Sequence, residues 1–298
     1  MTKAELDNRK ILPLEDSWYR RVKEKLDGIA KPLDGLGKFE HLIAQIGAIE
    51  KTTKISIQKK AVLVMCADNG VVEEQVSQSG KEVTLAVAKA MGVNNSSVGK
   101  MAAVAGVDVI PVDIGIDTDE VIPGVLPRKV AKGTKNFAKE PAMTEEEVLK
   151  AIETGIQLVQ QCHREGYEIL ATGEMGIGNT TTSTAVAAAL LDLEVEQVTG
   201  KGAGLTDEAL KRKCRVIEEA IEKYSLRDAD AFTILKTVGG LDIAGLTGVF
   251  IGAAIEQIPV VIDGVISAVA ALLAETLCKG AVNYMIPVSY THLRAHET

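Results

Sequence analysis

The chain has 298 residues, of which 46% are hydrophobic, 25% are charged and 3% are aromatic. This composition is typical of a globular protein with an aliphatic core, in one large domain or two unequal ones. The formal net charge of −8 argues against nucleic acids and anionic membranes as partners, because both bind to basic surfaces. The apolar stretches are interrupted by Gly, Asp or Pro before they reach the length of a membrane span.

The first residues and the cysteines indicate where the protein resides. Residues 1–5 contain no apolar stretch, so the sequence predicts no signal peptide. None of the four cysteines belongs to a C-x-x-C pair. We therefore expect reduced, buried thiols in a cytoplasmic protein.

Residues 1–50 have the pattern of helices. The segment 31–37 contains Pro and Gly and is predicted to be a loop. The helix that follows places five apolar side chains on one face: Leu36, Phe39, Leu42, Ile43 and Ile46.

After residue 60, short apolar strands alternate with helical stretches. The predicted strands, each followed by Gly, Asp or Glu, are 61–67, 107–114, 169–171, 234–238 and 258–262. The predicted helices are 144–165, 180–191, 206–224 and 265–277, and the Gly/Pro/Lys-rich segment 117–143 is predicted to be a loop. This alternation predicts an α/β fold with a mainly parallel sheet flanked by helices. Because the carboxyl ends of parallel strands form a ligand crevice, we expect one site at the polar strand ends.

The most informative string is Gly173–Thr181, GEMGIGNTT, which follows a predicted strand and opens a helix. Gly176 and Gly178 allow close backbone approach and positive φ, and a helix N-terminus attracts an anion such as phosphate. A plain capped turn is the alternative that glycine spacing alone leaves open. Glu174 favours a ligand site, because a loop that only held a phosphate would not normally place a negative charge there. A carboxylate is expected if a cationic group of a ligand also lies nearby. The candidates for capping and side-chain hydrogen bonds are Asn179, Thr180 and Thr181.

A second glycine-rich string, Thr199–Leu205, precedes the predicted helix at 206–224. Lys201, Lys211 and Lys213 lie close to it in sequence, and any of them is able to neutralise a phosphate. For each lysine taken singly, a position on a solvated helix face is the plainer alternative.

A third string, Ala67–Glu74, follows the first strand and continues into a polar segment. Asp68 is placed to anchor the loop by accepting backbone N–H bonds. Ser77, Gln78 and Ser79 are candidates to line a small pocket for an aromatic base, and a polar surface loop is the alternative. We predict no metal site, because Asp residues beside Gly are common in turns and no histidine has metal-ligand spacing.

These strings resemble, in the same order along residues 15–287, those of the nicotinate-nucleotide–dimethylbenzimidazole phosphoribosyltransferase (CobT) family. Gly173–Thr181 is the most specific match. The other similar strings are 31–37, 67–74, 200–205, 238–244 and 261–264. This chain departs from the family at Leu33 and Asp34, and at Asn69, where histidine is common.

The resemblance implies transfer of ribose 5-phosphate from nicotinate mononucleotide to 5,6-dimethylbenzimidazole, which gives α-ribazole 5′-phosphate and nicotinate. It implies no metal or organic cofactor, and a homodimer. It also implies a Rossmann-like α/β catalytic domain, here residues 51–287, and a smaller helical domain built from chain ends, here including residues 1–50.

The resemblance also implies roles at matching positions. Glu174 is expected to stabilise the positive charge that develops on the ribose in the transition state. Gly202 and Lys213 are assigned to the phosphate and ribose, and Ser77, Gln78 and Ser79 to the benzimidazole. Asp68 and Asp263 join Gly176, Gly178 and 179–181 in the substrate site.

The similarity ends after Pro287. The family continues with a Ser/His-rich loop and with a LGEGTGA-like string whose Glu is the general base, and neither string occurs here. Residues 288–298 are interpreted as a foreign tail on a shortened reading frame. Because general-base catalysis is often worth roughly 10²- to 10⁴-fold in rate, we expect low activity of this chain. We also expect low stability, because the missing helices would leave apolar surface on the sheet and the small domain uncovered.

Three alternatives stay open on the sequence. One is a transferase of the same family with another base or a phenol as acceptor, which residues 77–83 would decide. Another is a non-catalytic nucleotide-binding protein, favoured by the missing general base and opposed by Glu174. A dinucleotide dehydrogenase is disfavoured, because no G-x-G-x-x-G string follows the first strand.

Overall fold

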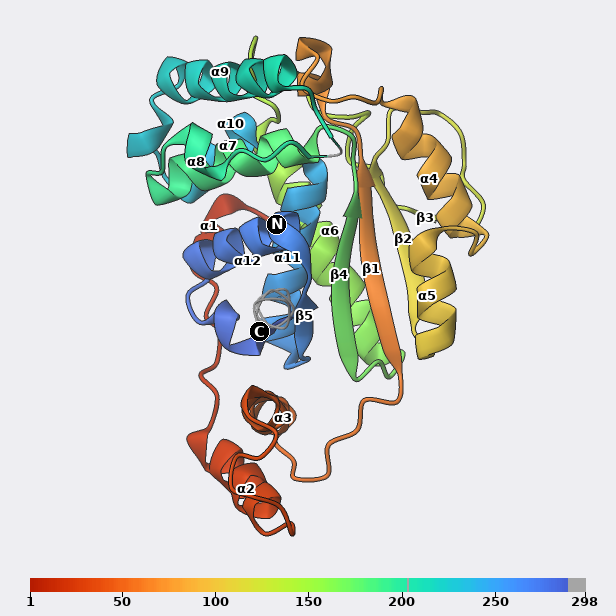
Figure 1. Ribbon diagram of the computed structural model, residues 1–298, viewed down its shortest axis with the longest axis vertical. Helices are drawn as coiled ribbons and strands as arrows, with labels where there is room; N and C mark the ends of the chain where they lie inside the picture. Colours follow the sequence, from red (N-terminus) through yellow and green to blue (C-terminus); the bar gives the residue numbers. More distant parts are fainter. Residues whose placement is uncertain (203, 289–298) are drawn as a thin grey trace.

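The computed structural model describes residues 1–202 and 204–288. Its centre is a six-stranded sheet in the order β3-β2-β1-β4-β5-β6 (Figure 1), and all neighbouring strands are parallel. The strands are β1 Lys60–Ala67, β2 Asp108–Gly115, β3 Leu126–Pro127, β4 Ile169–Met175, β5 Val260–Ile262 and β6 Met285–Pro287. This is the strand order of a doubly wound nucleotide-binding sheet, so the predicted α/β fold is confirmed.

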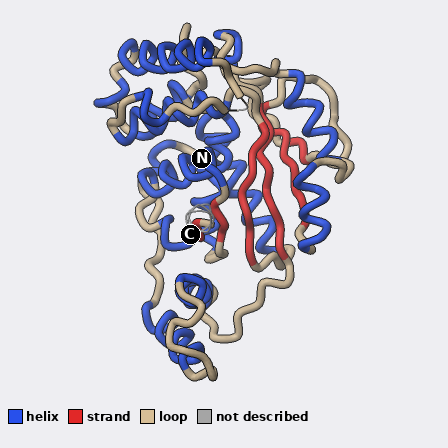
Figure 2. Tube along the Cα trace, in the orientation of Figure 1, coloured by secondary structure: helices blue, strands red, loops and turns tan. Residues whose placement is uncertain are grey.

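Helices cover the sheet and extend beyond its edges (Figure 2). Helices α4 and α5 pack against β2, whereas α11 packs against β1, β2 and β4 and is itself contacted by α6. The helices are α1 Lys3–Asp7, α2 Asp16–Asp27, α3 Lys38–Ile49, α4 Glu82–Gly92, α5 Ser97–Ala105, α6 Glu145–Arg164, α7 Asn179–Leu191, α8 Val195–Val198, α9 Asp207–Lys223, α10 Ala231–Val238, α11 Leu241–Glu256 and α12 Gly264–Leu277.

Most predicted elements occur close to their predicted bounds. The predicted strands at 61–67, 107–114 and 258–262 correspond to β1, β2 and β5, and the strand predicted at 169–171 continues to Met175 as β4. The four predicted helices correspond to α6, α7, α9 and α12. Segment 117–143 is mostly loop, as predicted, but it contributes β3 and three side chains of the main core, Phe137, Ala142 and Met143.

The prediction of a strand at 234–238 is wrong, because these residues form the second half of helix α10. Asp230 caps this helix, since its Oδ1 accepts a hydrogen bond of 2.8 Å from the Thr233 N–H. The apolar residues also follow a helical period: Ala231, Ile234, Leu235 and Val238 are all buried. The strand prediction rests on the short apolar run at 234–238 and does not take account of the helix cap at Asp230 that precedes it.

Helix α11 is not predicted by the sequence pattern, because it is buried on all sides along 241–254 and has no polar face. Glycines allow its close contact with α6. A Cβ at Gly248 would lie 2.0 Å from the Ile152 carbonyl oxygen, and one at Gly155 would lie 2.1 Å from the Gly245 carbonyl oxygen. The two backbones are therefore in direct contact beneath the sheet.

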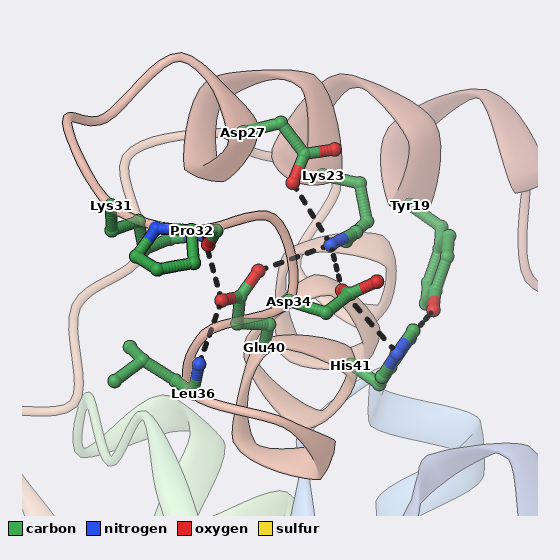
Figure 3. Close-up of polar contacts among 9 residues, drawn as sticks. All are labelled: Tyr19, Lys23, Asp27, Lys31, Pro32, Asp34, Leu36, Glu40 and His41. Carbon is green, nitrogen blue, oxygen red and sulfur yellow. Dashed lines mark hydrogen bonds and ion pairs between the residues drawn. The ribbon is translucent and has the colours of Figure 1, made fainter.

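Helices α2 and α3 form a separate pair beyond the amino-terminal edge of the sheet, held together by a buried carboxylate (Figures 1 and 3). Glu40 is fully buried and accepts from Lys31 Nζ at 2.7 Å, Lys23 Nζ at 3.0 Å and the Leu36 N–H at 3.1 Å. These donors lower the pKa of Glu40 to about 2. The cluster fixes the predicted 31–37 loop against both helices.

Three carboxylates of this helix pair, Asp27, Asp34 and Glu40, are close enough to bind a common cation. Lys23 Nζ lies 3.1, 2.6 and 3.0 Å from them, in that order (Figure 3). The lysine ammonium thus takes the place that a metal ion would need. His41, on α3, lies with Nδ1 2.6 Å from the Tyr19 hydroxyl.

All four cysteines are buried free thiols, as predicted. Within residues 1–202 and 204–288, no helix combines the length and the apolarity needed to cross a bilayer. The prediction of a foreign tail at 288–298 falls, except for Val288, outside the residues that the structure describes.

Candidate active site

The predicted site residues gather at the carboxyl ends of β1 and β4, at the upper end of the sheet in Figure 1. These neighbouring strands are the point where the strand order reverses, since the chain proceeds from β1 toward β2 and β3 and from β4 toward β5 and β6. At such a switch point the loops diverge and leave a crevice for a ligand. Asp68 follows β1, and Gly176 follows β4.

The Gly173–Thr181 string forms a tight turn from β4 into α7. Gly178 has a φ of 92°, a left-handed conformation that favours glycine. No side chain caps the first turn of α7, and the Asn179 and Thr181 N–H groups donate to the carbonyl oxygens of Gly176 at 3.1 Å and Gly178 at 2.9 Å. The positive end of the helix dipole at this turn is suited to an anion. The capping role predicted for 179–181 is not observed. Thr181 is fully buried, and its hydroxyl has no partner among the described residues.

Lys213, on α9, is 1% exposed and reaches the first turn of α7. Its Nζ donates to Thr180 Oγ1 at 2.9 Å and to the Gly200 carbonyl oxygen at 3.2 Å. Burial lowers the pKa of Lys213 to about 8, because a charged amine is disfavoured away from water. A buried lysine beside a helix N-terminus is a ready partner for a dianionic phosphate.

The other two candidate lysines behave as solvated residues. Lys201 is exposed and pairs with Asp207 at 2.7 Å, and Lys211 is exposed on α9. Gly202 is the member of its string that approaches the site most closely: a Cβ at this position would lie 3.2 Å from Thr180 Oγ1. The second string therefore places Gly202, and the following helix α9 places Lys213, beside Thr180.

Glu174 lies near the end of β4, paired in register with Met65 of β1. Its side chain is partly buried. Burial, together with the negative charges of Asp242 and Asp263, raises the pKa of Glu174 to about 7. A carboxyl that titrates near neutrality at a strand end is suited to proton transfer or to stabilising a cation.

The third string contacts the second across the crevice. Gln78 Nε2 donates a hydrogen bond to the Gly204 carbonyl oxygen, which brings the 77–79 segment beside the 200–205 loop. Ser77 and Ser79 are partly buried, and the Ser79 N–H donates to Ser77 Oγ at 3.3 Å.

Asp68 anchors the neighbouring loop after β2, whereas the sequence predicts that it anchors its own loop after β1. It is 5% exposed, and its Oδ2 accepts from the Asp117 N–H at 2.8 Å. Burial raises the pKa of this carboxyl. Asp263, by contrast, is an exposed residue between β5 and α12, close enough to influence the charge of Glu174.

Two site residues were missed by the sequence analysis: Asn69, which was noted only as a departure from the family, and Asp242. Asn69 is 2% exposed, and Asp242 is fully buried in the first turn of α11. Asp242 Oδ2 accepts from Asn179 Nδ2 at 3.2 Å, so it is connected to the start of α7. The signal available was the acidic residue two positions after Gly239-Gly240, in the matching string 238–244.

Comparisons with known proteins identify the family. The family model DBI_PRT, described as phosphoribosyltransferase, matches residues 11–298. The chain is 46% identical, over 266 residues, to the nicotinate-nucleotide–dimethylbenzimidazole phosphoribosyltransferase of Acetivibrio thermocellus, covering 89% of this chain and 76% of that protein. This chain belongs to that family. The Clostridioides difficile member is 38% identical over 297 residues, covering 100% of this chain and 84% of that protein.

A solved member of the family has the same fold. The crystal structure of CobT from Thermus thermophilus superposes with a TM-score of 0.86 at 32% sequence identity, covering 91% of this chain and 81% of that one. The resemblance drawn from the ordered strings, and the doubly wound fold it implied, are therefore both confirmed.

Proposed function

We propose that this chain transfers ribose 5-phosphate from nicotinate mononucleotide to 5,6-dimethylbenzimidazole, releasing nicotinate and α-ribazole 5′-phosphate. The observation that carries the proposal is the buried Lys213 amine, hydrogen-bonded to Thr180 in the first turn of α7. It supplies a positive charge where a nucleotide phosphate would meet the positive end of the α7 dipole. The family membership supports the substrates, because the relatives carry both in their name.

The phosphate end of nicotinate mononucleotide is proposed to lie between α7 and the 200–202 loop. Lys213 holds the phosphate by charge, and the positive end of the α7 dipole attracts it. Gly202 keeps this space open, since a side chain there would contact Thr180 Oγ1. This positioning would hold the reacting carbon of the ribose near the carboxyl end of β4.

Glu174 is proposed to act at the ribose. As the bond to nicotinate breaks, positive charge develops on the sugar, and a nearby carboxylate stabilises it. The neighbouring acids Asp242 and Asp263 raise the pKa of Glu174, so its ionised form is poised to accept a compensating positive charge. Asp263, directly after β5, is proposed to stabilise the same positive charge on the ribose from the solvent-exposed side of the site.

The acceptor is proposed to bind beside Ser77, Gln78 and Ser79. The contact of Gln78 with Gly204 brings this segment beside the loop that holds Gly202, so the base would approach the ribose from the face opposite to nicotinate. Such an approach gives inversion at the reacting carbon. Asp68, held by the Asp117 N–H, is proposed to fix the start of the acceptor loop.

We further propose a cytoplasmic homodimer that acts without a metal or organic cofactor. Helices α2 and α3, with the rest of residues 1–50, are proposed to belong to a smaller helical domain beside the catalytic domain at 51–287. Analytical ultracentrifugation tests the dimer, and a monomer at micromolar concentration would contradict it.

The decisive experiment measures nicotinate release from nicotinate mononucleotide, with and without dimethylbenzimidazole, by chromatography with mass detection. Benzimidazole-dependent release with α-ribazole phosphate as product supports the proposed function. Nucleotide binding with no release from a folded sample contradicts it and favours a non-catalytic binding protein. Adenine and a phenol, tested as acceptors in parallel, decide the choice of acceptor.

A further inference from the structure

A buried polar cluster joins three elements at the switch point. Asn69 follows β1, Gly176 follows β4, and Asp242 lies in the first turn of α11. Asp242 is fully buried and Asn69 is 2% exposed. A carboxyl and a carboxamide so far from water need hydrogen-bond partners within the protein, because burying unpaired polar atoms is costly.

Two glycines show how the carboxyl and the amide are aligned. A Cβ at Gly176 would lie 2.7 Å from Asp242 Oδ2 and 3.1 Å from Asn69 Nδ2. A Cβ at Gly240 would lie 2.4 Å from Asp242 Oδ1 and 2.6 Å from Asn69 Oδ1. Each carboxyl oxygen of Asp242 therefore shares a neighbouring glycine with one end of the Asn69 amide: Oδ2 and the amide nitrogen both face Gly176, and Oδ1 and the amide oxygen both face Gly240.

The hydrogen bonds at this pair are incomplete if Asp242 is ionised. Asp242 Oδ1 accepts from the Ile243 N–H at 2.9 Å, Oδ2 accepts from Asn179 Nδ2 at 3.2 Å, and the Asn69 amide also bonds to this carboxyl. Asn69 Oδ1 is buried and has no donor among the described residues. An ionised carboxylate only accepts hydrogen bonds, whereas a carboxylic acid donates one.

We propose that Asp242 carries a proton in the folded protein and donates it to Asn69 Oδ1, and that this acid–amide pair is a clamp that positions the Gly173–Thr181 loop. Asp242 is thus a positioning residue. It acts through Asn179, the first residue of α7, and through the close approach that only a glycine at 176 permits.

Burial favours the neutral acid and raises the pKa of Asp242 to about 6, against the opposing effect of the hydrogen bonds from the Ile243 N–H, Asn179 and Asn69. A hydrogen bond donated by the acid form would raise the pKa further. The titratable groups that face it are Glu174 on β4 and the Cys66 thiol on β1, while α7 presents the neutral Asn179. A second negative charge beside Glu174 is unfavourable, so a proton on Asp242 leaves Glu174 freer to ionise.

The protonation is tested by spectroscopy, which does not depend on activity. Infrared or carbon-13 NMR spectra, recorded with labelled aspartate, report carboxylic acids at pH 5, where ordinary aspartates are ionised. We expect one acid signal that is lost in Asp242→Asn and that titrates at lower pH in Asn69→Ala. Absence of this signal from the unmodified protein at pH 5, or an unchanged midpoint in Asn69→Ala, would overturn the pair.

The positioning role rests on the proposed function and is tested by binding of nicotinate mononucleotide. Asp242→Asn retains a donor toward Asn69 Oδ1, so its affinity should stay within about threefold of the unmodified protein. Asp242→Leu has similar size but no hydrogen bonds, and its affinity should fall by about tenfold or more. Equal losses of affinity in the two variants would contradict a clamp that depends on a protonated Asp242. Failure of all three proteins to bind would contradict the proposed function and leave the spectroscopic result standing.

Discussion

Lys213 Nζ lies 2.9 Å from Thr180 Oγ1 in a position where only 1% of the lysine is exposed. Burial lowers the pKa of this amine to about 8, and the group that acts against this shift is the Cys214 thiol, not a carboxylate. A buried amine without an anionic partner is unfavourable for stability, so the arrangement is best explained by a ligand that brings the negative charge. This relationship distinguishes the site from an ordinary strand-to-helix turn.

Replacing Lys213 with Met is expected to weaken binding of nicotinate mononucleotide by about 10- to 100-fold, since hydrogen bonds to charged groups contribute about 1.5–3 kcal/mol. Folding should be retained, because a methionine fills the buried space without a charge. Calorimetric titration measures the affinity. The matched control is Lys201→Met, which removes an exposed lysine of the same region and should change affinity less than twofold or so. Equal effects of the two substitutions would contradict a specific role for Lys213.

Replacing Glu174 with Gln is expected to lower kcat by about 10²- to 10³-fold, the cost of removing one group that stabilises transition-state charge. The KM for nicotinate mononucleotide should change little, because the phosphate contacts remain. Steady-state kinetics measure both constants. The control is Glu196→Gln, on the exposed side of α8. Full activity of Glu174→Gln would refute the assigned role.

The pH dependence of kcat/KM should be bell-shaped. Activity is expected to rise as Glu174 ionises through a pKa of about 7, and to fall as Lys213 loses its proton through a pKa of about 8. The variant Glu174→Gln should lose the acidic limb and keep the basic one. A profile whose acidic limb persists in that variant would assign the limb to another group.

The three candidate lysines show what the sequence was able to predict. Their proximity to a glycine-rich string identified a phosphate region, but did not separate Lys213 from Lys201 and Lys211. The helical period does separate them: Lys213 lies one turn before Val216 and Ile217, both buried residues of α9, so it shares their face. The family resemblance already selects Lys213 as the phosphate lysine, and the helical period agrees with that choice.

Asp242 was not identified as a candidate residue from the sequence. Strand ends, loop glycines and family strings were sufficient to place Glu174 and the start of α7. Helix α11, however, is apolar on every side, because the sheet and α6 both cover it, and its residues therefore show no amphipathic period. Because this helix was not predicted, Asp242 in its first turn had no predicted neighbours. Its contact with Asn179 arises only from tertiary packing.

Replacing Gly176 with Ala is expected to destabilise the protein by about 1–3 kcal/mol, the usual cost of adding a group to a fully packed position. The new Cβ would lie 2.5 Å from the Ala67 carbonyl oxygen and 2.7 Å from Asp242 Oδ2. Urea unfolding measures the change. Gly28→Ala is the control, because its Cβ would meet atoms no closer than 3.4 Å and the residue has a right-handed helical backbone. An unchanged stability of Gly176→Ala would show that the loop adapts.

Glu50, at the end of α3, provides a test of stability remote from the active site. It lines a cavity of about 600 Å³ together with His163, Glu168 and Glu256, and its Oε1 is buried without a partner among the described residues. Burial, and then the charge of Glu168, raises the pKa of Glu50 from 4.5 to about 7.

The sign of the effect follows from proton linkage. Between pH 4.5 and 7 the folded state holds the Glu50 proton more tightly than the unfolded state does, so this group makes stability fall as the pH rises through that window. Glu50→Gln stays neutral and avoids the loss. After a reduction for partial exposure, the variant should be more stable by about 1–2 kcal/mol at pH 8 and equally stable at pH 4.5. Urea unfolding at the two pH values measures this, with exposed Glu24→Gln as the control. A gain of equal size at both pH values would show that ionisation of Glu50 is not its cause.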